Sequence, residues 1–572
     1  MCGILGAISN KRFDVEKALN YLSHRGPDNS SYYKDRNLIL GHTRLSINDL
    51  SIEANQPFED ENVVVVFNGE IYNYLELKKD LKYNFRTNCE AEVICKLYTK
   101  HGKSFVNKLD GMFAIALYDK VQGVLYCYRD RLGKKPFFYY LDEKTQEFYF
   151  ASEQKVFPSF GIELQFDTRI LDNILNFTFY KKESIYSNIK SLEPSQMLSI
   201  GLSDFKITKE KYFELSDLID ENYYKELSSR NCEQILDELL DKSVKKRLIS
   251  DVPVGIIGSG GIDSSLIAHY VNRYDKYNLL HINSVDSSEL KYANVLAKDL
   301  NVDVVYKDLD YEVFKKDLDS TLFYWEYPLV HTNAVGILNV SRLAQENGYK
   351  VLLGGEGADE LFGGYPYHQL YYKSLLLDKY SKLLPTKFLQ ALLYVRGDTK
   401  TANIEPTIEH VYNNERFAKY EAKYNFIKDK TERKMLTYLA TELEEYLVPL
   451  LSRADRMSMS HGVEMRLPFL DMDIIKFAMN LPLNKKMSLK KSKIILRNIG
   501  SSILSKELLT RPKIGFTVDY AKRYIEEKKI DSLNNLDAYI DSKIVIEHLK
   551  KANQYHKLMR LYSLDKILGG VN

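Results

Sequence analysis

The residues with the clearest chemical potential form the stretch SGGIDSS at 259–265. This stretch follows an apolar strand predicted over 253–257 and leads into a helix predicted over 264–274, whose apolar face includes Leu266 and Tyr270. Backbone N–H groups at such a helix N-terminus favour a phosphate group, and glycines let the backbone approach it closely. A capped strand-to-helix turn is the structural alternative.

Two other phosphate-binding patterns are excluded at this loop. The dinucleotide pattern GxGxxG fails because Asp263 occupies its last glycine position, and a Walker loop fails because no GK[ST] follows. The stretch resembles the pyrophosphate loop of the N-type ATP pyrophosphatases, which cleave ATP between the α and β phosphates. That resemblance implies ATP contacts from Ser259, Gly260, Gly261, Asp263, Ser264 and Ser265.

A second glycine-rich segment, VLLGGEGADELFGGY at 351–365, adds acidic residues. Its glycines follow an apolar strand, and open α/β sheets bind ligands at the carboxyl ends of their strands. Glu356, Asp359 and Glu360 would repel a phosphate unless Mg²⁺ lies between carboxylate and phosphate. We therefore expect Asp263 and Asp359 to bind Mg²⁺, with an ordinary capped helix start as the alternative for this segment.

A basic run, LKKSKIILR at 489–497, could serve the same site. Lys490, Lys493 and Arg497 recur at i, i+3 and i+7, which predicts one face of a helix. Such a face is usually solvated. Beside the two glycine-rich segments, the run becomes a candidate for facing pyrophosphate.

Cys2 directly follows the initiator methionine in the stretch MCGILG. Chain ends are tolerant, so this cysteine alone indicates little. Each of the later N-terminal motifs could also be only a turn or a sheet segment. These motifs are HRGPD (24–28), HTRLSIND (42–49), NGEIYNY (68–74) and GMFAIALYD (111–119).

The elements that must position these residues fall into two patterns. Over 1–205, short strand-like runs recur and only two helical stretches, near 15–22 and 90–100, interrupt them, which predicts an α+β domain with mostly antiparallel sheet. The charged segment 206–232 is predicted to be a connection. Over 233–572, helices first alternate with short apolar strands and then dominate, which predicts a parallel, doubly wound α/β sheet with a helical C-terminal part.

Composition favours a small-molecule enzyme. A chain of 572 residues with 45% hydrophobic residues indicates two domains or three. Eighty basic against 78 acidic residues give a net charge of +2, so neither nucleic acid nor a membrane surface is an expected partner. Five cysteines without CxxC spacing indicate a reducing compartment and no zinc site. With no leader peptide and no long apolar run, we expect a soluble cytoplasmic protein.

The N-terminal motifs, in this order after MCGI, resemble the class II (N-terminal nucleophile, Ntn) glutamine amidotransferases. With motifs of the second half, the likeness covers nearly the whole chain and is to the glutamine-hydrolysing asparagine synthetase family. It implies a glutaminase domain of the Ntn-hydrolase fold, with stacked antiparallel sheets and flanking helices, before an ATP-pyrophosphatase domain. It also leaves a homodimer as a candidate assembly. The further motifs are SDVPVGIIGSGGIDSS (250–265), GGEGADELFGGY (354–365) and RMSMSHGVEMRLPFLD (456–471).

The resemblance implies that Cys2 attacks the side-chain amide of glutamine, forms a thioester and releases ammonia. Once Met1 is removed, the free α-amine of Cys2, with a pKa of about 8, can take the thiol proton. Asn68 and the backbone N–H of Gly69 would form the oxyanion hole. Arg44 would hold the glutamine α-carboxylate, since a forked guanidinium suits it. The other implied pocket residues are Ile47, Glu70 and Glu90.

Glu90 is a departure from the family pattern. The family usually places an Asp at the glutamine α-amine, in a Ser-Asp-x-Glu-Val-Ile context, whereas this chain reads CEAEVI at 89–94. The charge is kept and the reach is one methylene longer. We expect the affinity for glutamine to change and the activity to remain.

In the second half, the resemblance implies an acyl-AMP intermediate. A substrate carboxylate would attack the α-phosphate of ATP, and ammonia would then displace AMP to form an amide. Glu356 would act as a base or orienting group for ammonia, and Lys493 would stabilise charge on the phosphates. Ammonia is mostly protonated in water at neutral pH, so a dry passage between the sites would keep it reactive. Further implied ATP contacts are Ile257, Val285, Gly354 and Gly355.

The acceptor carboxylate is the open question. Well-known bacterial asparagine-forming members carry a Thr-Ile-Arg-Ala-Ser-Thr run where this chain reads WEYPLVHTNAVGIL (325–338), which contains no arginine. Relatives with Glu-x-Pro and a run like His-Thr-Asn include enzymes that amidate uronic-acid sugars of surface polysaccharides. Aspartate is the favoured acceptor, a sugar acid is the alternative, and either makes His331, Thr332 and Asn333 candidate contacts beside a purely structural loop.

A third hypothesis is a non-catalytic homologue that binds nucleotide or partners. A mere binding module would not require all of the residues that the chain retains for chemistry. These residues are Cys2, Asn68, Asp263, Glu356 and Lys493.

Overall fold

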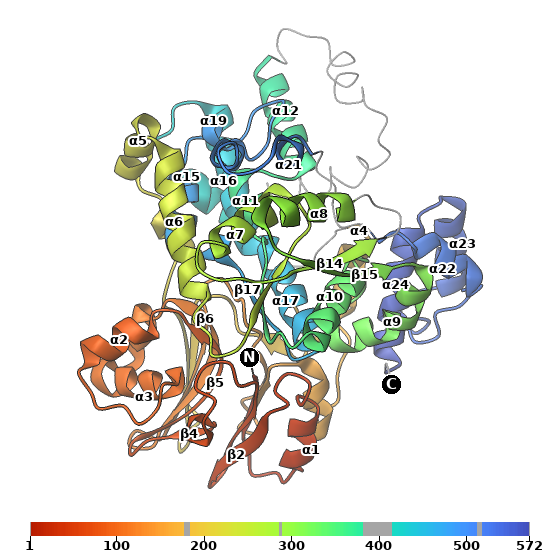
Figure 1. The fold of residues 1–572 in the computed structure, drawn as a ribbon. Helices are drawn as coiled ribbons and strands as arrows, with labels where there is room; N and C mark the ends of the chain where they lie inside the picture. Colours follow the sequence, from red (N-terminus) through yellow and green to blue (C-terminus); the bar gives the residue numbers. More distant parts are fainter. Residues whose placement is uncertain (1, 177–182, 285–288, 381–414, 512–517, 571–572) are drawn as a thin grey trace.

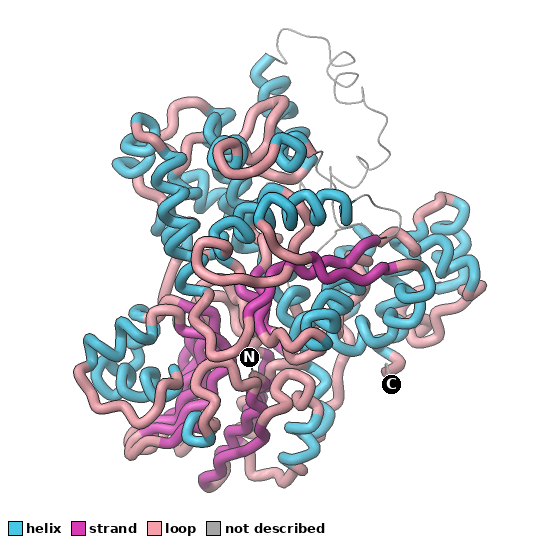
Figure 2. The backbone as a smooth tube through the Cα atoms, in the orientation of Figure 1, coloured by secondary structure: helices cyan, strands magenta, loops and turns pink. Residues whose placement is uncertain are grey.

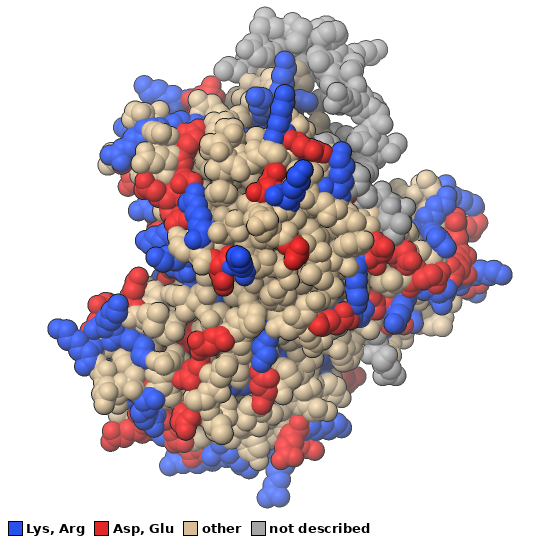
Figure 3. Space-filling model, in the orientation of Figure 1, with Lys and Arg blue, Asp and Glu red and all other residues tan. Residues whose placement is uncertain are grey.

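A sheet sandwich and a parallel sheet organise the chain in the computed structural model (Figure 1), which describes residues 2–176, 183–284, 289–380, 415–511 and 518–570. The tube in Figure 2 shows the strands of the sandwich gathered in one half of the molecule and helices dominating the other. In the part of the chain described, no helix is long and apolar enough to cross a membrane. On the face drawn in Figure 3, basic and acidic side chains are interspersed, in keeping with the small net charge.

The sandwich consists of two six-stranded sheets, with strand orders β10-β8-β9-β1-β3-β2 and β12-β11-β7-β6-β5-β4. Neighbouring strands in both sheets are antiparallel, as expected from the closely spaced strand-like runs. The strands of the first sheet are β1 (Gly3–Ile8), β2 (Asn29–Asp35), β3 (Leu38–Arg44), β8 (Phe138–Asp142), β9 (Glu147–Ala151) and β10 (Lys190–Ser191). Those of the second are β4 (Phe58–Glu59), β5 (Val63–Ile71), β6 (Gly111–Asp119), β7 (Val124–Arg129), β11 (Gln196–Gly201) and β12 (Ile207–Lys211).

The first five residues of strand β5, Val63 to Phe67, are all apolar because both faces of the strand are buried there. Val64 and Val66 pack between the two sheets, together with Ile4 and Leu40 of the first sheet. Val63, Val65 and Phe67 point the other way, into a core that they share with α2 (Tyr74–Leu81) and α3 (Glu90–His101). Helix α1 (Val15–Asn20) packs on the outer face of the first sheet. The result is a four-layer arrangement, helix, sheet, sheet, helix, which confirms the predicted Ntn-hydrolase fold class.

The segment predicted as a connection, residues 206–232, is more ordered than an irregular linker. It contributes β12, which pairs with β11 at the edge of the second sheet, and then α5 (Glu221–Ser229). The three consecutive charged residues of β12, Lys209, Glu210 and Lys211, are exposed, which suits an edge strand. The antiparallel sheet therefore continues past residue 205.

The second half is built on a five-stranded parallel sheet in the order β15-β14-β13-β16-β17. Helices cover both faces: Leu279 and Leu353 pack against one group of helices, and Leu280 and Leu352 against the other. The strands are β13 (Val254–Ile257), β14 (Leu279–Ser284), β15 (Val304–Leu309), β16 (Val351–Leu353) and β17 (Glu464–Arg466). Helix α6 (Cys232–Arg247) precedes β13, and the helices between β13 and β16 are α7 (Ile262–Val271), α8 (Glu289–Leu300), α9 (Tyr311–Trp325) and α10 (Ala334–Glu346).

The strand order reverses between β13 and β16. The chain first runs outward from β13 to β15 and then returns to add β16 on the other side of β13. Such a switch point opens a crevice at the carboxyl ends of the two strands. The two glycine-rich segments follow these two strands, so the topology brings them together.

The rest of the described chain is helical, as expected, apart from β17. Three of the later helices, α22, α23 and α24, form a group beside α9 and α4 (Leu171–Asn176) (Figure 1). The remaining helices are α11 (Ala358–Phe362), α12 (Pro366–Tyr380), α15 (Glu415–Lys423), α16 (Lys430–Glu445), α17 (Leu447–Met459), α18 (Met472–Asn480), α19 (Leu483–Lys486), α20 (Ile494–Gly500), α21 (Lys506–Thr510), α22 (Ala521–Glu527), α23 (Ser542–Lys551) and α24 (Tyr555–Leu568).

Candidate active sites

The first candidate site surrounds Cys2, immediately before β1. The Cys2 backbone nitrogen donates a hydrogen bond of 3.2 Å to Oδ1 of Asn68 on the neighbouring strand β5. The small cavity beside Cys2 is lined by most of the residues expected to bind glutamine. Those residues are Arg44, Ile47, Gly69, Glu70 and Glu90.

Asn68 and Gly69 are the two residues expected to form the oxyanion hole. The Asn68 side-chain amide is fully buried, and its Nδ2 has no hydrogen-bond partner among the residues described. Gly69 has φ of 149°, and a Cβ there would lie 1.9 Å from the Met112 carbonyl oxygen. Glycine is thus required on both conformational and steric grounds. An unpaired buried donor next to a thiol can stabilise an oxyanion formed by attack at that thiol.

Burial raises the pKa of the Cys2 thiol, so the buried side chain is protonated at neutral pH. The residue is 8% exposed. A neutral thiol is a weak nucleophile, and a neighbouring base is therefore needed to remove its proton. This requirement fits the expected use of the α-amine of the same residue.

Arg44 is anchored by three hydrogen bonds. Its Nη1 donates to the Ser51 carbonyl oxygen and to Asn55 Oδ1, both at 2.7 Å, and its Nη2 donates to the Asp49 carbonyl oxygen. These acceptors are neutral, so they leave the guanidinium charge available to an incoming carboxylate.

Glu70 and Glu90 lie together under Asn48, which the sequence analysis did not assign to the site. Asn48 Nδ2 donates to Glu70 Oε2 at 2.7 Å and to Glu90 Oε1 at 3.0 Å. Burial raises the pKa of both carboxyl groups. Arg466, on β17 of the parallel sheet, is 3.2 Å from Glu70. The acidic wall of this cavity is therefore tied to the other half of the chain.

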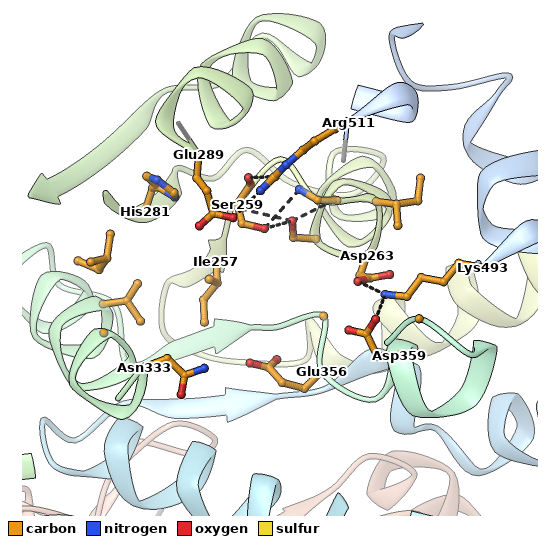
Figure 4. A pocket seen from close by; sticks show the side chains of 18 of the residues that line it. Ile257, Ser259, Asp263, His281, Glu289, Asn333, Glu356, Asp359, Lys493 and Arg511 are labelled. Atoms are coloured by element: carbon orange, nitrogen blue, oxygen red, sulfur yellow. Dashed lines mark hydrogen bonds and ion pairs between the residues drawn. The ribbon is translucent and has the colours of Figure 1, made fainter. Parts of the chain in front are cut away.

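The second candidate site is a cavity of about 270 Å³ at the switch point of the parallel sheet (Figure 4). Its lining includes most of the residues expected to bind ATP or metal. These are Ile257, Ser259, Gly261, Asp263, Ser264, Gly355, Glu356, Asp359 and Lys493.

Three other expected ATP contacts, Gly260, Gly354 and Ser265, do not line the cavity. A Cβ on Gly260, where φ is 67°, would lie 2.5 Å from the Tyr292 backbone, and a Cβ on Gly354 would lie 2.2 Å from Glu356 Oε2. Ser265 is buried in the first turn of α7. The fourth, Val285, lies outside the described residues.

The glycine-rich loop after β13 is held by its own serines. Gly261 N donates to Ser259 Oγ at 3.3 Å, and the Ser259 and Ser264 hydroxyls are 3.1 Å apart. Helix α7 begins at Ile262 with no side chain capping its N-terminus. Its first N–H groups are therefore available to a phosphate.

Lys493 lies between the two carboxylates expected to bind metal. Its Nζ is 2.5 Å from Asp263 Oδ2 and 2.6 Å from Asp359 Oδ1 (Figure 4). Burial alone would lower the pKa of Lys493, but the two carboxylates outweigh burial and raise it, so the ammonium stays charged. A buried cation beside a phosphate-binding loop can compensate charge on a polyphosphate.

The prediction that Lys490, Lys493 and Arg497 share a helical face is wrong. Helix α20 begins only at Ile494, and Lys493 precedes it with φ of 53°. Lys490 is exposed and does not line the cavity, whereas Lys493 and Arg497 do. The ion pairs of Lys493 hold it in a conformation that the local sequence does not favour.

The carboxylates are suited to Mg²⁺. Asp263 Oδ1 is buried with no hydrogen-bond partner in the described part of the chain, although Oδ2 bonds to Lys493. No group of three or more His, Cys, Asp or Glu side chains able to hold a metal occurs among the described residues. Mg²⁺ in nucleotide sites commonly uses one or two carboxylates and takes its other ligands from phosphate and water. Asp263 and Asp359 fit that donor set.

Glu356 projects into the cavity from the loop after β16 (Figure 4). Its Oε2 is buried and lacks a hydrogen-bond partner within the described residues, and burial raises the pKa of its carboxyl group. Arg453 on α17, which the sequence analysis did not assign, also lines the cavity and interacts with the Glu356 charge. Arg453 Nη1 donates to Asn333 Oδ1 at 2.9 Å.

Of the three candidate acceptor contacts, only Asn333 lines the cavity. Burial lowers the pKa of His331 well below its usual value, so this imidazole is neutral. Thr332 is half-buried and is not part of the cavity wall. His281, Glu289 and Arg511 also line the cavity without having been assigned, because no short motif marks them.

Buried ion pairs join the sandwich to the parallel-sheet half. Arg25, from the HRGPD motif, bonds to Glu153 at 2.9 Å and to Asp455 at 2.8 Å, and Lys135 reaches the same Asp455 at 3.1 Å. With the Glu70–Arg466 pair, these contacts tie the two halves together. Removal of one partner of such a buried pair is strongly destabilising, because it leaves an uncompensated buried charge.

Comparison with known proteins matches both halves of the chain to known families. Residues 235–568 match the asparagine synthase family, and residues 1–213 match the glutamine amidotransferase domain. The chain is 29% identical over 603 residues to asparagine synthetase [glutamine-hydrolyzing] 1 of Bacillus subtilis (strain 168), covering 96% of this chain and 93% of the relative. It is 33% identical over 527 residues to putative asparagine synthetase [glutamine-hydrolyzing] 1 of Methanocaldococcus jannaschii, covering 85% of this chain and 82% of that relative.

Proposed function

Because the chain belongs to the asparagine synthase family and is a glutamine-hydrolysing ligase, we propose that it converts aspartate, glutamine and ATP to asparagine, glutamate, AMP and diphosphate. The observation that carries the proposal is the pairing of two sites in one chain. One holds a thiol whose residue contacts Asn68, a residue with a buried and unpaired amide donor, and the other holds a glycine-rich loop with Lys493, Asp263 and Glu356.

In the glutaminase half, Cys2 acts as the nucleophile. The α-amine of Cys2, free after removal of Met1, takes the thiol proton, and the sulfur attacks the side-chain carbonyl carbon of glutamine. Asn68 Nδ2 and the Gly69 N–H stabilise the oxyanion, each by about 3 kcal/mol. Arg44 holds the α-carboxylate and Glu90 the α-ammonium group of glutamine. Ammonia leaves, and water hydrolyses the thioester to glutamate.

In the synthetase half, an oxygen of the acceptor carboxylate attacks the α-phosphorus and the bond to diphosphate breaks. The loop from Ser259 to Ser265 binds the leaving diphosphate through backbone N–H groups, and Lys493 compensates its charge. Mg²⁺ held by Asp263 and Asp359 would neutralise further phosphate charge when bound.

Glu356 completes the reaction. Ammonia attacks the acyl carbon of the acyl-AMP, and the nitrogen must lose a proton as AMP leaves. Burial raises the pKa of the Glu356 carboxyl group, which makes its carboxylate a better proton acceptor than an exposed one. Glu356 lines the cavity where the acyl-AMP would lie, and its Oε2 has no hydrogen-bond partner among the described residues.

The second candidate acceptor is a uronic-acid sugar. The absence of arginine in segment 325–338 favours it, because aspartate presents a second carboxylate that needs a cation. Arg453 supplies a cation from α17 and lines the same cavity, which favours aspartate. This geometry keeps aspartate as the main proposal.

A single assay distinguishes the two acceptors. The protein is incubated with glutamine, ATP and Mg²⁺, together with either aspartate or UDP-glucuronate, and glutamate, AMP, diphosphate and the amide are measured. We expect diphosphate release to depend on aspartate and to match asparagine formed. Glutamate release without asparagine contradicts aspartate as acceptor, and diphosphate release that depends on UDP-glucuronate supports the sugar acid.

The role proposed for Glu90 leads to a second expected result. Glu90→Gln removes the anionic partner of the glutamine α-ammonium, a charged hydrogen bond of about 2 kcal/mol, so KM for glutamine should rise about 30-fold. Glu90→Asp, which restores the usual family residue, should retain glutamine use. Synthesis from ammonium chloride should be unchanged in both variants. An unaltered KM for glutamine in Glu90→Gln would show that another group binds the ammonium.

A further inference from the structure

His281 lies on β14 and lines the synthetase cavity, yet none of the roles described above uses it. Its side chain is almost completely enclosed, with the residue 3% exposed. In Figure 4 the ring lies near Glu289, on the side of the cavity away from Lys493 and Asp359. A buried imidazole in a ligand cavity needs partners for both ring nitrogens.

One ring nitrogen has a partner that determines the tautomer. Nδ1 is 3.0 Å from the carbonyl oxygen of Gly258, just before the glycine-rich loop. A carbonyl oxygen can only accept a hydrogen bond, so Nδ1 carries the proton. Burial lowers the pKa of His281 to about 4, which keeps the ring neutral at physiological pH. The other nitrogen, Nε2, is therefore only an acceptor.

Nε2 is buried and receives no hydrogen bond from any residue that the structure describes. A buried acceptor left without a donor is costly, whereas one that meets a ligand donor gains affinity and selectivity. The missing partner must carry an N–H or O–H group. Phosphate oxygens and carboxylates carry none at neutral pH.

The place of His281 in the cavity selects the nucleoside as the source of that donor. Lys493 and the glycine-rich loop before α7 lie at the end of the cavity that is proposed to bind the phosphates. Apolar side chains line the cavity together with His281, as a base requires, and they are Ile282, Ile337 and Val340. The donors on this part of ATP are the adenine 6-amino group and the ribose hydroxyls.

We propose that Nε2 of His281 accepts a hydrogen bond from a nucleoside N–H or O–H group of ATP and thereby reads the nucleotide. The inference rests on the proposed use of ATP by this site. If the donor is the adenine amine, His281 also discriminates against guanine. Guanine has a carbonyl oxygen at that position, which would place two hydrogen-bond acceptors opposite each other.

The test combines enzyme variants with nucleotide analogues. Dissociation constants and kcat/KM are measured for ATP, purine-riboside triphosphate, which lacks the 6-amino group, 2′-deoxy-ATP and 3′-deoxy-ATP. They are measured for the unaltered enzyme, for His281→Phe, which has no acceptor, and for His281→Gln, which retains one. Glutaminase activity reports folding of each variant.

For the unaltered enzyme, we expect one analogue to bind about tenfold more weakly than ATP. His281→Phe should weaken the binding of ATP by a similar factor and abolish the difference in affinity between ATP and that analogue. His281→Gln should restore part of this difference. The analogue that shows the coupling identifies the base or the sugar as the donor.

Damage to the loop through the lost Gly258 contact would instead weaken all four nucleotides equally. The inference is overturned if His281→Phe weakens the binding of all four nucleotides equally. It is also overturned if this variant still distinguishes ATP from the analogue. Failure of the unaltered enzyme to bind or use ATP overturns the proposed function, and this inference falls with it.

Discussion

Replacement of Cys2 by alanine is expected to abolish amide synthesis from glutamine while synthesis from ammonium chloride continues. Cys2 supplies both the sulfur that attacks glutamine and the amine that activates it, so no other group can take its place. The cavity with Glu356 and Lys493 does not involve Cys2 and should still accept free ammonia. Glutamate release and amide formation are measured separately with each nitrogen source.

Cys127→Ala is the matched control for Cys2→Ala. Cys127 is another buried thiol, on β7 in the core between the two sheets, where it touches neither cavity. This variant should keep glutamine use, with at most a modest loss of stability. A normal glutaminase rate in Cys2→Ala would refute the assignment. Mass spectrometry of the purified enzyme should find Cys2 as its first residue.

The sequence predicted the elements whose pattern is local. The run VVVVFNGEI matches β5, because a strand between two cores is apolar on both faces. Helix α9 also has a local pattern, because Phe314, Leu318 and Leu322 recur every four residues. Helix α2 was not predicted, since only the stretches near 15–22 and 90–100 were expected to be helical in the first half of the chain.

Strand β17 had no local pattern to predict it. It contains only Glu464, Met465 and Arg466, and short charged runs usually form loops. Both charged side chains are fully buried, and each has the other as a partner. Only the tertiary fold, which places this strand beside β16, explains why such residues occupy a sheet interior.

The site residues also divide into those that a local motif marks and those that only the tertiary fold brings to the site. Those within motifs, such as Cys2, Asn68 and Glu356, were identified because each lies in a short stretch that resembles a family motif. Arg453 and Arg466 lie far along the chain from the residues they serve. No spacing rule connects them, so only the structure could bring them together.

Replacement of Lys493 by methionine is expected to reduce diphosphate release by about 10²- to 10³-fold and to leave the glutaminase rate unchanged. Lys493 is 3% exposed in its side chain and is the cation that meets both Asp263 and Asp359. Its loss removes charge stabilisation where negative charge develops on the leaving diphosphate. It also leaves two carboxylates facing each other, which disfavours binding of a polyphosphate.

The experiment measures diphosphate and glutamate from the same samples, with the midpoint of thermal unfolding as a check on folding. Lys490→Met is the matched control, since Lys490 is exposed and lies outside the cavity, and it should behave like the unaltered enzyme. Lys493→Arg keeps the charge but not its compact shape, so it should recover only part of the activity. Because the glutaminase cavity does not contain Lys493, a parallel loss of both activities would indicate a folding defect. Full diphosphate release from a well-folded Lys493→Met enzyme would instead show that Asp263 and Asp359 act without this cation.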